Sequence, residues 1–208
     1  CGRPQISAGL LGEARSLVEQ SAGPLASELE SSGAIAMIML EPSCLSAIHE
    51  EWRELESSVP SATARRLAEE TTSIEMFLEQ RWDTHPRCPR VSLPDSITVH
   101  PHCHAKVDRG VFGRLLDRLG AVDAEVLDSG CCGLAGSFGY VAENAELSRR
   151  IFEQSLGDTV DRSEAGPLVA AGTSCRHQCN DLAEVCAIHP ATLIAQAMQS
   201  VARDPVAP

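Results

Sequence analysis

The sequence lacks any apolar run near the roughly 18 residues that a membrane-spanning helix needs, so we expect no membrane span. It also lacks the basic-then-apolar start of a secretion signal, because it opens with Cys1-Gly2-Arg3-Pro4. The missing initiator Met indicates that an upstream part is absent. Aromatic residues make up only 3% of the chain, so its cores must be built mostly from Ala, Leu, Val and Ile. We therefore expect a cytoplasmic protein, which can also lie against the inner face of the membrane.

Basic charge is scarce as well. The chain has 17 Lys and Arg against 29 Asp and Glu, which gives a formal net charge of −12. No Lys/Arg stripe compensates for this excess, and most of such a surface would repel a phosphate backbone. The composition therefore argues against nucleic acid as a partner.

Cysteine, in contrast, is abundant. The nine cysteines are an odd number, and they include the adjacent pair Cys131-Cys132. Without a secretion signal, a disulfide framework is the weaker interpretation. In a reducing cytoplasm, clustered cysteines more often serve as metal ligands or redox groups, because the thiolate is a soft and strong donor.

Apolar patterns alternate between strands and helices along the chain. The Pro-rich stretch 83–95 is predicted to be a linker between segments 1–82 and 96–208. The alternation favours an α/β fold with mainly parallel sheets flanked by helices. Strands are predicted at 34–40, 96–100, 121–127 and 167–171. Helices are predicted at 8–22, shortly after Pro24, around Ile48 and Trp52, and at 61–81, 109–119, 142–156, 176–186 and 190–202.

The cysteine spacing reveals an internal repeat. Cys1 and Cys132 each precede a glycine, and the distances from them to Cys44 and Cys175 are equal, since 44 − 1 = 43 and 175 − 132 = 43. Both later cysteines follow a serine and stand just after an apolar strand. The chain is thus predicted to hold two related half-domains, of which the first has lost its beginning.

In the second segment, cysteines follow the ends of three predicted strands. The carboxyl ends of parallel strands lie along one edge of a sheet, where ligands bind, so these thiols are expected to converge. Glycines after the adjacent pair let the backbone turn tightly and bring N–H groups near sulfur. The predicted ligands are Cys103, Cys131, Cys132 and Cys175.

These residues resemble the cysteine-rich CCG domain, in which a cysteine, a Cys-Cys-Gly and a closing cysteine motif occur twice. That domain is found in heterodisulfide reductase and in the iron–sulfur subunits of glycolate, lactate and anaerobic glycerol-3-phosphate oxidising enzymes. HPHCH, GCCGLAGSFGY and GTSCRHQ look most like the carboxy-terminal iron–sulfur part of FAD-linked D-lactate or 2-hydroxyacid dehydrogenases. CGRPQISAGLL and LEPSCLSAI look like the preceding repeat of that family, whose opening pair reads Cys-Cys-Gly-Arg-Pro. On that match, Cys1 is the second cysteine of a truncated pair.

The resemblance implies an iron–sulfur cluster of the 4Fe-4S type on the four cysteines of the second segment, and a second site with Cys1 and Cys44. It further implies an FAD-binding dehydrogenase domain or subunit as partner, and a quinone or a redox protein as electron acceptor. The chain would relay electrons from the flavin to that acceptor.

The sequence departs from heterodisulfide reductase at the closing Cys-x-x-Cys, since position 178 is Gln and position 47 is Ala. This argues against the non-cubane cluster of that enzyme and favours a four-ligand cluster, or a single Zn²⁺ or Fe ion. No C-x₂-C-x₂-C-x₃-C-P run and no dinucleotide fingerprint occur. The chain alone is therefore not expected to oxidise a substrate.

Two other functions compete with electron relay. One is a non-redox zinc domain for structure or assembly, and the other is thiol–disulfide chemistry like that of heterodisulfide reductase. Cys186 is expected in a helix core and Cys88 in a loop without function. Further candidate ligands are Cys179, His102, His104 and His177.

Overall fold

The computed structural model describes residues 1–84, 86, 88–105, 108, 110–160 and 166–203. The chain divides into two compact units, Cys1–Ser73 and Ile74–Pro208. Leu78 and Trp82, which precede the predicted linker 83–95, pack into a core of the second unit, and the predicted domain bounds stay a prediction. Within the described part, no helix combines the length and the apolarity that a membrane crossing requires.

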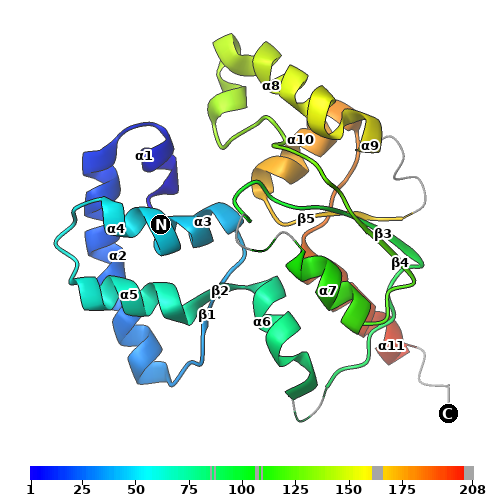
Figure 1. Cartoon of the computed structure of the whole chain (residues 1–208), viewed down its shortest axis with the longest axis horizontal. Helices are drawn as coiled ribbons and strands as arrows, with labels where there is room; N and C mark the ends of the chain where they lie inside the picture. The colour runs from blue at the N-terminus through cyan, green and yellow to red at the C-terminus, as the bar shows by residue number, and fades with distance from the viewer. Residues whose placement is uncertain (85, 87, 106–107, 109, 161–165, 204–208) are drawn as a thin grey trace. The chain divides into compact units, whose positions relative to one another are not determined.

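The first unit is mostly helical around a two-stranded parallel sheet (Figure 1). Strands β1 and β2 pair with Met37 opposite Thr71. Its core joins Val18, Ile48, Trp52 and Leu67, so the predicted helix around Ile48 and Trp52 is confirmed. The elements are α1 (Arg3–Ser7), α2 (Leu11–Ser32), β1 (Met37–Met39), α3 (Pro42–Ser46), η1 (Ala47–Glu51), α4 (Trp52–Glu54), α5 (Ser61–Glu70) and β2 (Thr71–Ser73).

Two helix predictions in this unit are wrong. Helix α2 runs through Pro24 instead of ending near residue 22. Pro24 is exposed, so water can reach the carbonyl that loses its hydrogen bond, while Ala22 and Leu29 on the buried face continue the packing. The predicted helix 61–81 is interrupted by β2, whose Thr71 and Thr72 favour a strand because both are branched at Cβ.

The second unit holds a three-stranded, fully parallel sheet in the order β4-β3-β5. This confirms the predicted α/β class. The strands are β3 (Ser96–His100), β4 (Asp123–Val126) and β5 (Leu168–Ala170). The helices are α6 (Ile74–Arg81), η2 (Trp82–Thr84), α7 (Val111–Arg118), η3 (Phe138–Tyr140), η4 (Ala142–Asn144), α8 (Ala145–Phe152), η5 (Glu153–Gly157), α9 (Asp158–Val160), α10 (Thr173–Ala183) and α11 (Pro190–Arg203). The first residue of the predicted helix 109–119 lies outside the described residues.

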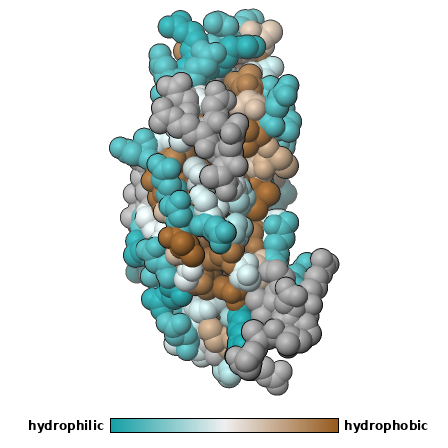
Figure 2. Space-filling model, turned by 90° about the vertical axis from the view of Figure 1, so that its right-hand side faces the viewer, coloured by the Kyte–Doolittle hydropathy of each residue, from teal (hydrophilic) through white to brown (hydrophobic). Residues whose placement is uncertain are grey.

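Helices cover both faces of this sheet, with α8, α9 and α10 on one side and α7 and α11 on the other (Figure 1). Val169 points to the face of α7 and α11, whereas its neighbours Leu168 and Ala170 point to the face of α10. β4 is an edge strand, and Val122 just before it is 84% exposed. Figure 2, seen from the side of β3, β4 and α11, shows hydrophobic residues between hydrophilic ones on the surface.

Candidate metal centre

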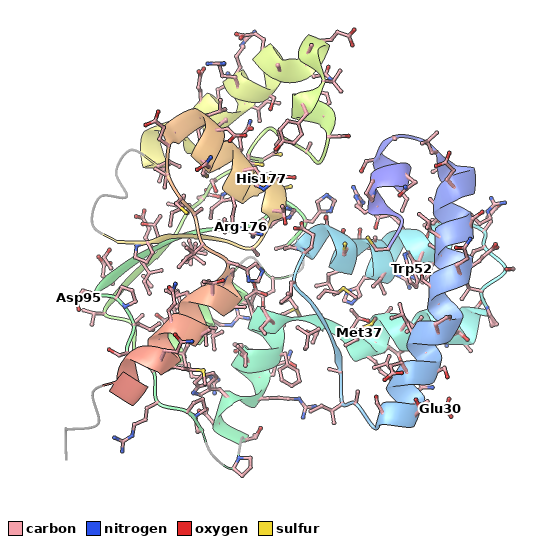
Figure 3. All side chains as sticks on the ribbon, turned by 180° about the vertical axis from the view of Figure 1, so that it is seen from behind. Glu30, Met37, Trp52, Asp95, Arg176 and His177 are labelled. Atoms are coloured by element: carbon pink, nitrogen blue, oxygen red, sulfur yellow. The ribbon has the colours of Figure 1, made fainter. Side chains whose placement is uncertain are left out.

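Each strand of the second unit leads into a cysteine loop. β3 ends at His100 and Cys103 follows, β4 ends at Val126 before the adjacent cysteine pair, and Cys175 lies in the first turn of α10 after β5. All three strands are parallel, so these loops leave the same edge of the sheet. In Figure 3 the labels Arg176 and His177 mark the start of α10.

The four predicted ligands lie together in a chain of sulfur contacts. Cys103 contacts Cys131, Cys131 contacts Cys132, and Cys132 contacts Cys175. Cys132 and Cys175 are buried, whereas Cys103 and Cys131 are half-buried, so the site reaches the surface at one end. The convergence expected from the strand ends is therefore present, and the ligand role of the four thiols stays a prediction.

The sulfur contacts divide the thiols into proton donors and acceptors. Hydrogen bonds from Cys103 and then Cys132 lower the pKa of Cys131. A hydrogen bond from Cys132, with help from His100 and His102, lowers the pKa of Cys175. The pKa values of Cys103 and Cys132 are raised because these thiols share their protons with the two acceptors. A soft cation bound by these sulfurs would displace the shared protons.

Backbone N–H groups add to the stabilisation of negative sulfur. The N–H of Gly133 donates to Cys131 Sγ at 3.4 Å, and the N–H of Leu134 donates to the sulfur of Cys132. Gly133 adopts a φ of 89°. A Cβ there would lie 2.3 Å from the carbonyl oxygen of Ser148, so no other residue fits this turn without displacing the backbone.

Of the three candidate histidines, His102 lies closest to the thiols. Its Nδ1 accepts a hydrogen bond from the backbone N–H of His104 at 3.0 Å, which leaves the ring proton of the neutral form on Nε2. A Cβ on Gly172 would lie 2.5 Å from that Nε2 and 3.1 Å from Cys175 Sγ. The ring thus occupies space that only a glycine leaves open beside Cys175.

The other two histidines lie farther out. The ring of His104 is 5.6 Å from that of His102, centroid to centroid. His177 is exposed, and its Nδ1 lies 3.1 Å from the hydroxyl of Tyr140. Neither histidine has a sulfur contact among those described above, and their ligand roles stay predictions.

His100, which is only 2% exposed, was not among the site residues predicted from the sequence. Its Nδ1 lies 2.7 Å from Ser129 Oγ, and its ring approaches Cys175 closely enough to lower the pKa of that thiol. Within the described residues, Nε2 of His100 makes no hydrogen bond. Burying such an atom without a partner costs about 1–3 kcal/mol. The sequence signal that could have identified His100 is the alternation along the strand, which places Ile97 and Val99 on one face of the sheet and His100 on the other.

The first unit contains a smaller version of the site. Cys1 Sγ and Cys44 Sγ are 2.9 Å apart, and Cys44 lies in the first helix after β1, as Cys175 does after β5. The indole N–H of Trp52 donates to the carbonyl oxygen of Cys1 at 2.9 Å and holds the chain start against the core. Burial raises the pKa of the Cys44 thiol. Two of the predicted ligands are therefore neighbours here also.

Three cysteines stand apart from this pattern. Cys179 is fully buried one turn after Cys175, and burial together with the charge of Cys175 raises its pKa to about 12. It therefore keeps its proton in the core, although a ligand role stays a prediction. Cys88 is exposed, as expected of a loop residue. Cys186 is exposed too, so its predicted core position is wrong, because α10 ends at Ala183.

The donor set suits a group held by thiolates. Four soft sulfur donors, N–H groups aimed at them and an unpartnered buried imidazole nitrogen fit an iron–sulfur cluster, and the four thiols also fit zinc. Over the described ranges, no three His, Cys, Asp or Glu side chains are arranged as ligands of a single ion. The thiols contact one another in sequence instead.

The fold and the cysteines define an α/β module that gathers four thiols at one edge of a parallel sheet. No family model matches the chain. Over 202 residues it is 28% identical to a subunit of the anaerobic glycerol-3-phosphate dehydrogenase of Escherichia coli K12, covering 95% of this chain and 49% of that protein. The chain thus spans about half the length of this relative.

D-2-hydroxyglutarate dehydrogenases are similar over shorter stretches. The Pseudomonas putida protein is 33% identical over 135 residues, covering 60% of this chain and 13% of that protein. The Haemophilus influenzae protein is 29% identical over 109 residues, covering 49% of this chain and 10% of its own length. A glutamate racemase structure from Francisella tularensis has a TM-score of only 0.40 at 12% identity, and the match covers 92% of this chain and 65% of that one. The chain is thus homologous to parts of dehydrogenases.

Proposed function

We propose that this chain is the iron–sulfur electron-relay part of an FAD-linked 2-hydroxyacid dehydrogenase of the lactate or glycolate type. The observation that carries the proposal is the contact chain of four thiols at one sheet edge. Similarity to dehydrogenases along almost the whole chain supports it. A partner flavin would take the hydride of the substrate, and a quinone or a redox protein would receive the electrons.

Cys103, Cys131, Cys132 and Cys175 would hold the cluster, with Cys1 and Cys44 contributing to a second site. When bound, a 4Fe-4S cluster accepts and gives up one electron at a time, as transfer between a two-electron flavin and the next acceptor requires. The chain's own groups stabilise the sulfur charge through the N–H groups of Gly133 and Leu134. Burial keeps water from two of the four sulfurs.

The cytoplasmic location, with peripheral contact to the inner face of the membrane, belongs to the same proposal, since a quinone acceptor would be reached there. Thiol–disulfide chemistry has less support. Gln178 occupies the position of the extra thiolate, is 4% exposed and donates its Nε2–H to Ser148 Oγ at 2.9 Å. It therefore has a structural place in the core.

Iron and sulfide analysis of the anaerobically purified chain, with visible and electron paramagnetic resonance spectra, tests the proposal. Wild-type protein should contain iron and acid-labile sulfide and absorb broadly in the visible. Cys132→Ser should remove the iron held by the four thiols of the second unit, while Cys88→Ser and Cys186→Ser, at exposed cysteines, should retain it. A colourless protein with stoichiometric zinc would replace the proposal by the zinc domain. Equal iron in all three variants would refute the site.

A further inference from the structure

His100 is a buried titratable residue that the sequence motifs did not single out. It is the last residue of β3, stands opposite Ala170 of β5 in the parallel register, and is 2% exposed. Thr98 and His100 alternate with Ile97 and Val99, which face the core of α7 and α11. His100 therefore faces the other side of the sheet, where Cys175 begins α10.

Ser129 lies against one of the two ring nitrogens of His100. Its hydroxyl is buried, 6% of the residue being exposed, and lies 2.7 Å from Nδ1. A hydroxyl that donates to Nδ1 leaves the ring proton on Nε2. That Nε2 has no hydrogen-bond partner within the described part of the chain, although the ring lies beside Cys175. A buried ring nitrogen without a hydrogen-bond partner thus lies on a ring that neighbours a sulfur.

We infer that in the cluster-loaded protein His100, held by Ser129, donates its Nε2–H to the sulfur of Cys175 and so acts as a positioning residue that raises the reduction potential. This inference rests on the proposed function. Four thiols already complete the ligand set of a 4Fe-4S cluster, so a donor role suits His100 better than ligation. A donor at sulfur stabilises added negative charge, and reduction adds such charge.

Three variants of the full, anaerobically purified chain separate these roles. His100→Leu removes the donor at similar volume, His100→Gln keeps an N–H on a side chain of similar reach, and Ser129→Ala removes the group that orients the ring. His189→Gln is the control, because His189 Nδ1 accepts the N–H of Ala191 at the start of α11. The readouts are iron per chain and the midpoint potential from a redox titration followed by electron paramagnetic resonance.

His100→Leu should keep wild-type iron content and shift the midpoint potential to more negative values. Ser129→Ala should shift it less in the same direction, His100→Gln should restore part of the shift, and His189→Gln should leave the potential unchanged. If His100→Leu fails to fold, the glutamine and Ser129 variants still decide. The inference would be overturned if His100→Gln and Ser129→Ala had the wild-type potential and a folded His100→Leu showed no shift. It would also be overturned if His100→Leu or His100→Gln lost iron, because His100 would then be a ligand. Wild-type protein without iron would instead end the proposed function and this inference together.

Discussion

The two units contain the same local contact between two cysteines but differ in the residues around it. In both, a Ser-Cys pair opens a helix after a strand, and its sulfur meets the cysteine of a Cys-Gly turn whose glycine has a positive φ, 75° at Gly2 and 89° at Gly133. Cys1 and Cys44 make this contact in the first unit, whereas in the described part of the second unit Cys103 and Cys131 extend the contact to four thiols. The same spacing therefore produces the same local contact between two cysteines in both units.

A second difference lies beside the helix cysteine. The offset that aligns Cys44 with Cys175, 175 − 44 = 131, also aligns Glu41 with Gly172, since 172 − 131 = 41. Gly172 leaves room for the ring of His102, whereas Glu41 accepts a hydrogen bond from Ser43 Oγ at 3.1 Å. The second unit is thus shaped for an imidazole next to its sulfur, and the first unit is not.

The largest expected difference between the units is in metal content. Cys175→Ser should remove most of the iron, because only three thiols of the second unit's site remain. Cys44→Ser should spare that iron, because Cys44 belongs to the smaller site. Metal analysis of both variants in the full chain measures this difference. Equal iron loss in the two would remove the distinction between the units.

The next largest difference is expected in the stability lost when the turn glycines, Gly2 and Gly133, are replaced by alanine. Gly133→Ala forces a Cβ within 2.3 Å of a backbone oxygen, and we expect a loss of about 3 kcal/mol in unfolding free energy. Gly2→Ala meets its nearest atom at 3.4 Å, so only the positive φ opposes it, at about 1 kcal/mol. Denaturant unfolding of both variants tests the ranking, and similar losses would contradict it.

Gly172→Ala should act mainly on the site. Its Cβ would lie 2.1 Å from His102 Cδ2, so the ring must move, and we expect a loss of about 1–3 kcal/mol together with reduced iron content. Glu41→Ala, at the aligned position, removes the part-buried hydrogen bond from Ser43 Oγ and should cost about 1 kcal/mol. Full iron in Gly172→Ala would show that the ring's position is unimportant to the site.

The smallest effects concern the buried and exposed polar contacts of the second unit. Gln178→Ala leaves Ser148 Oγ without its buried donor and should cost about 1–2 kcal/mol, with iron retained, as denaturant unfolding and metal analysis can show.

Asp108→Asn should lower the stability of the fold less than Gln178→Ala does. The Arg114 guanidinium lowers the pKa of the Asp108 carboxyl, so the pair stabilises the fold above the ordinary Asp pKa and is lost as pH falls through the lowered one. Because the pair is exposed, its loss should only slightly flatten the acid side of a stability–pH curve. A pronounced flattening would show that the pair is better shielded than its exposure indicates.

Much of the second unit could be predicted from periodicity. The strand at Ser96–His100 occurs as predicted, and β4 and β5 lie within the predicted ranges. The elements of the first unit were harder to predict from the sequence. The apolar face of α2 continues past Pro24. Two threonines form β2 between helices that share one acidic, amphipathic pattern. In both cases packing against distant residues outweighed the local signal.

By itself, the sequence determined which cysteines would meet, since strand ends of a parallel sheet converge whatever the details of packing. Only the tertiary structure decided the chemistry at that edge. The proton sharing among the sulfurs, the space that Gly172 leaves for His102, and the burial of His100 against Ser129 arise from contacts between residues up to dozens of positions apart. Hydrogen bonds and burial act over a few ångströms, and no spacing in the chain specifies those distances.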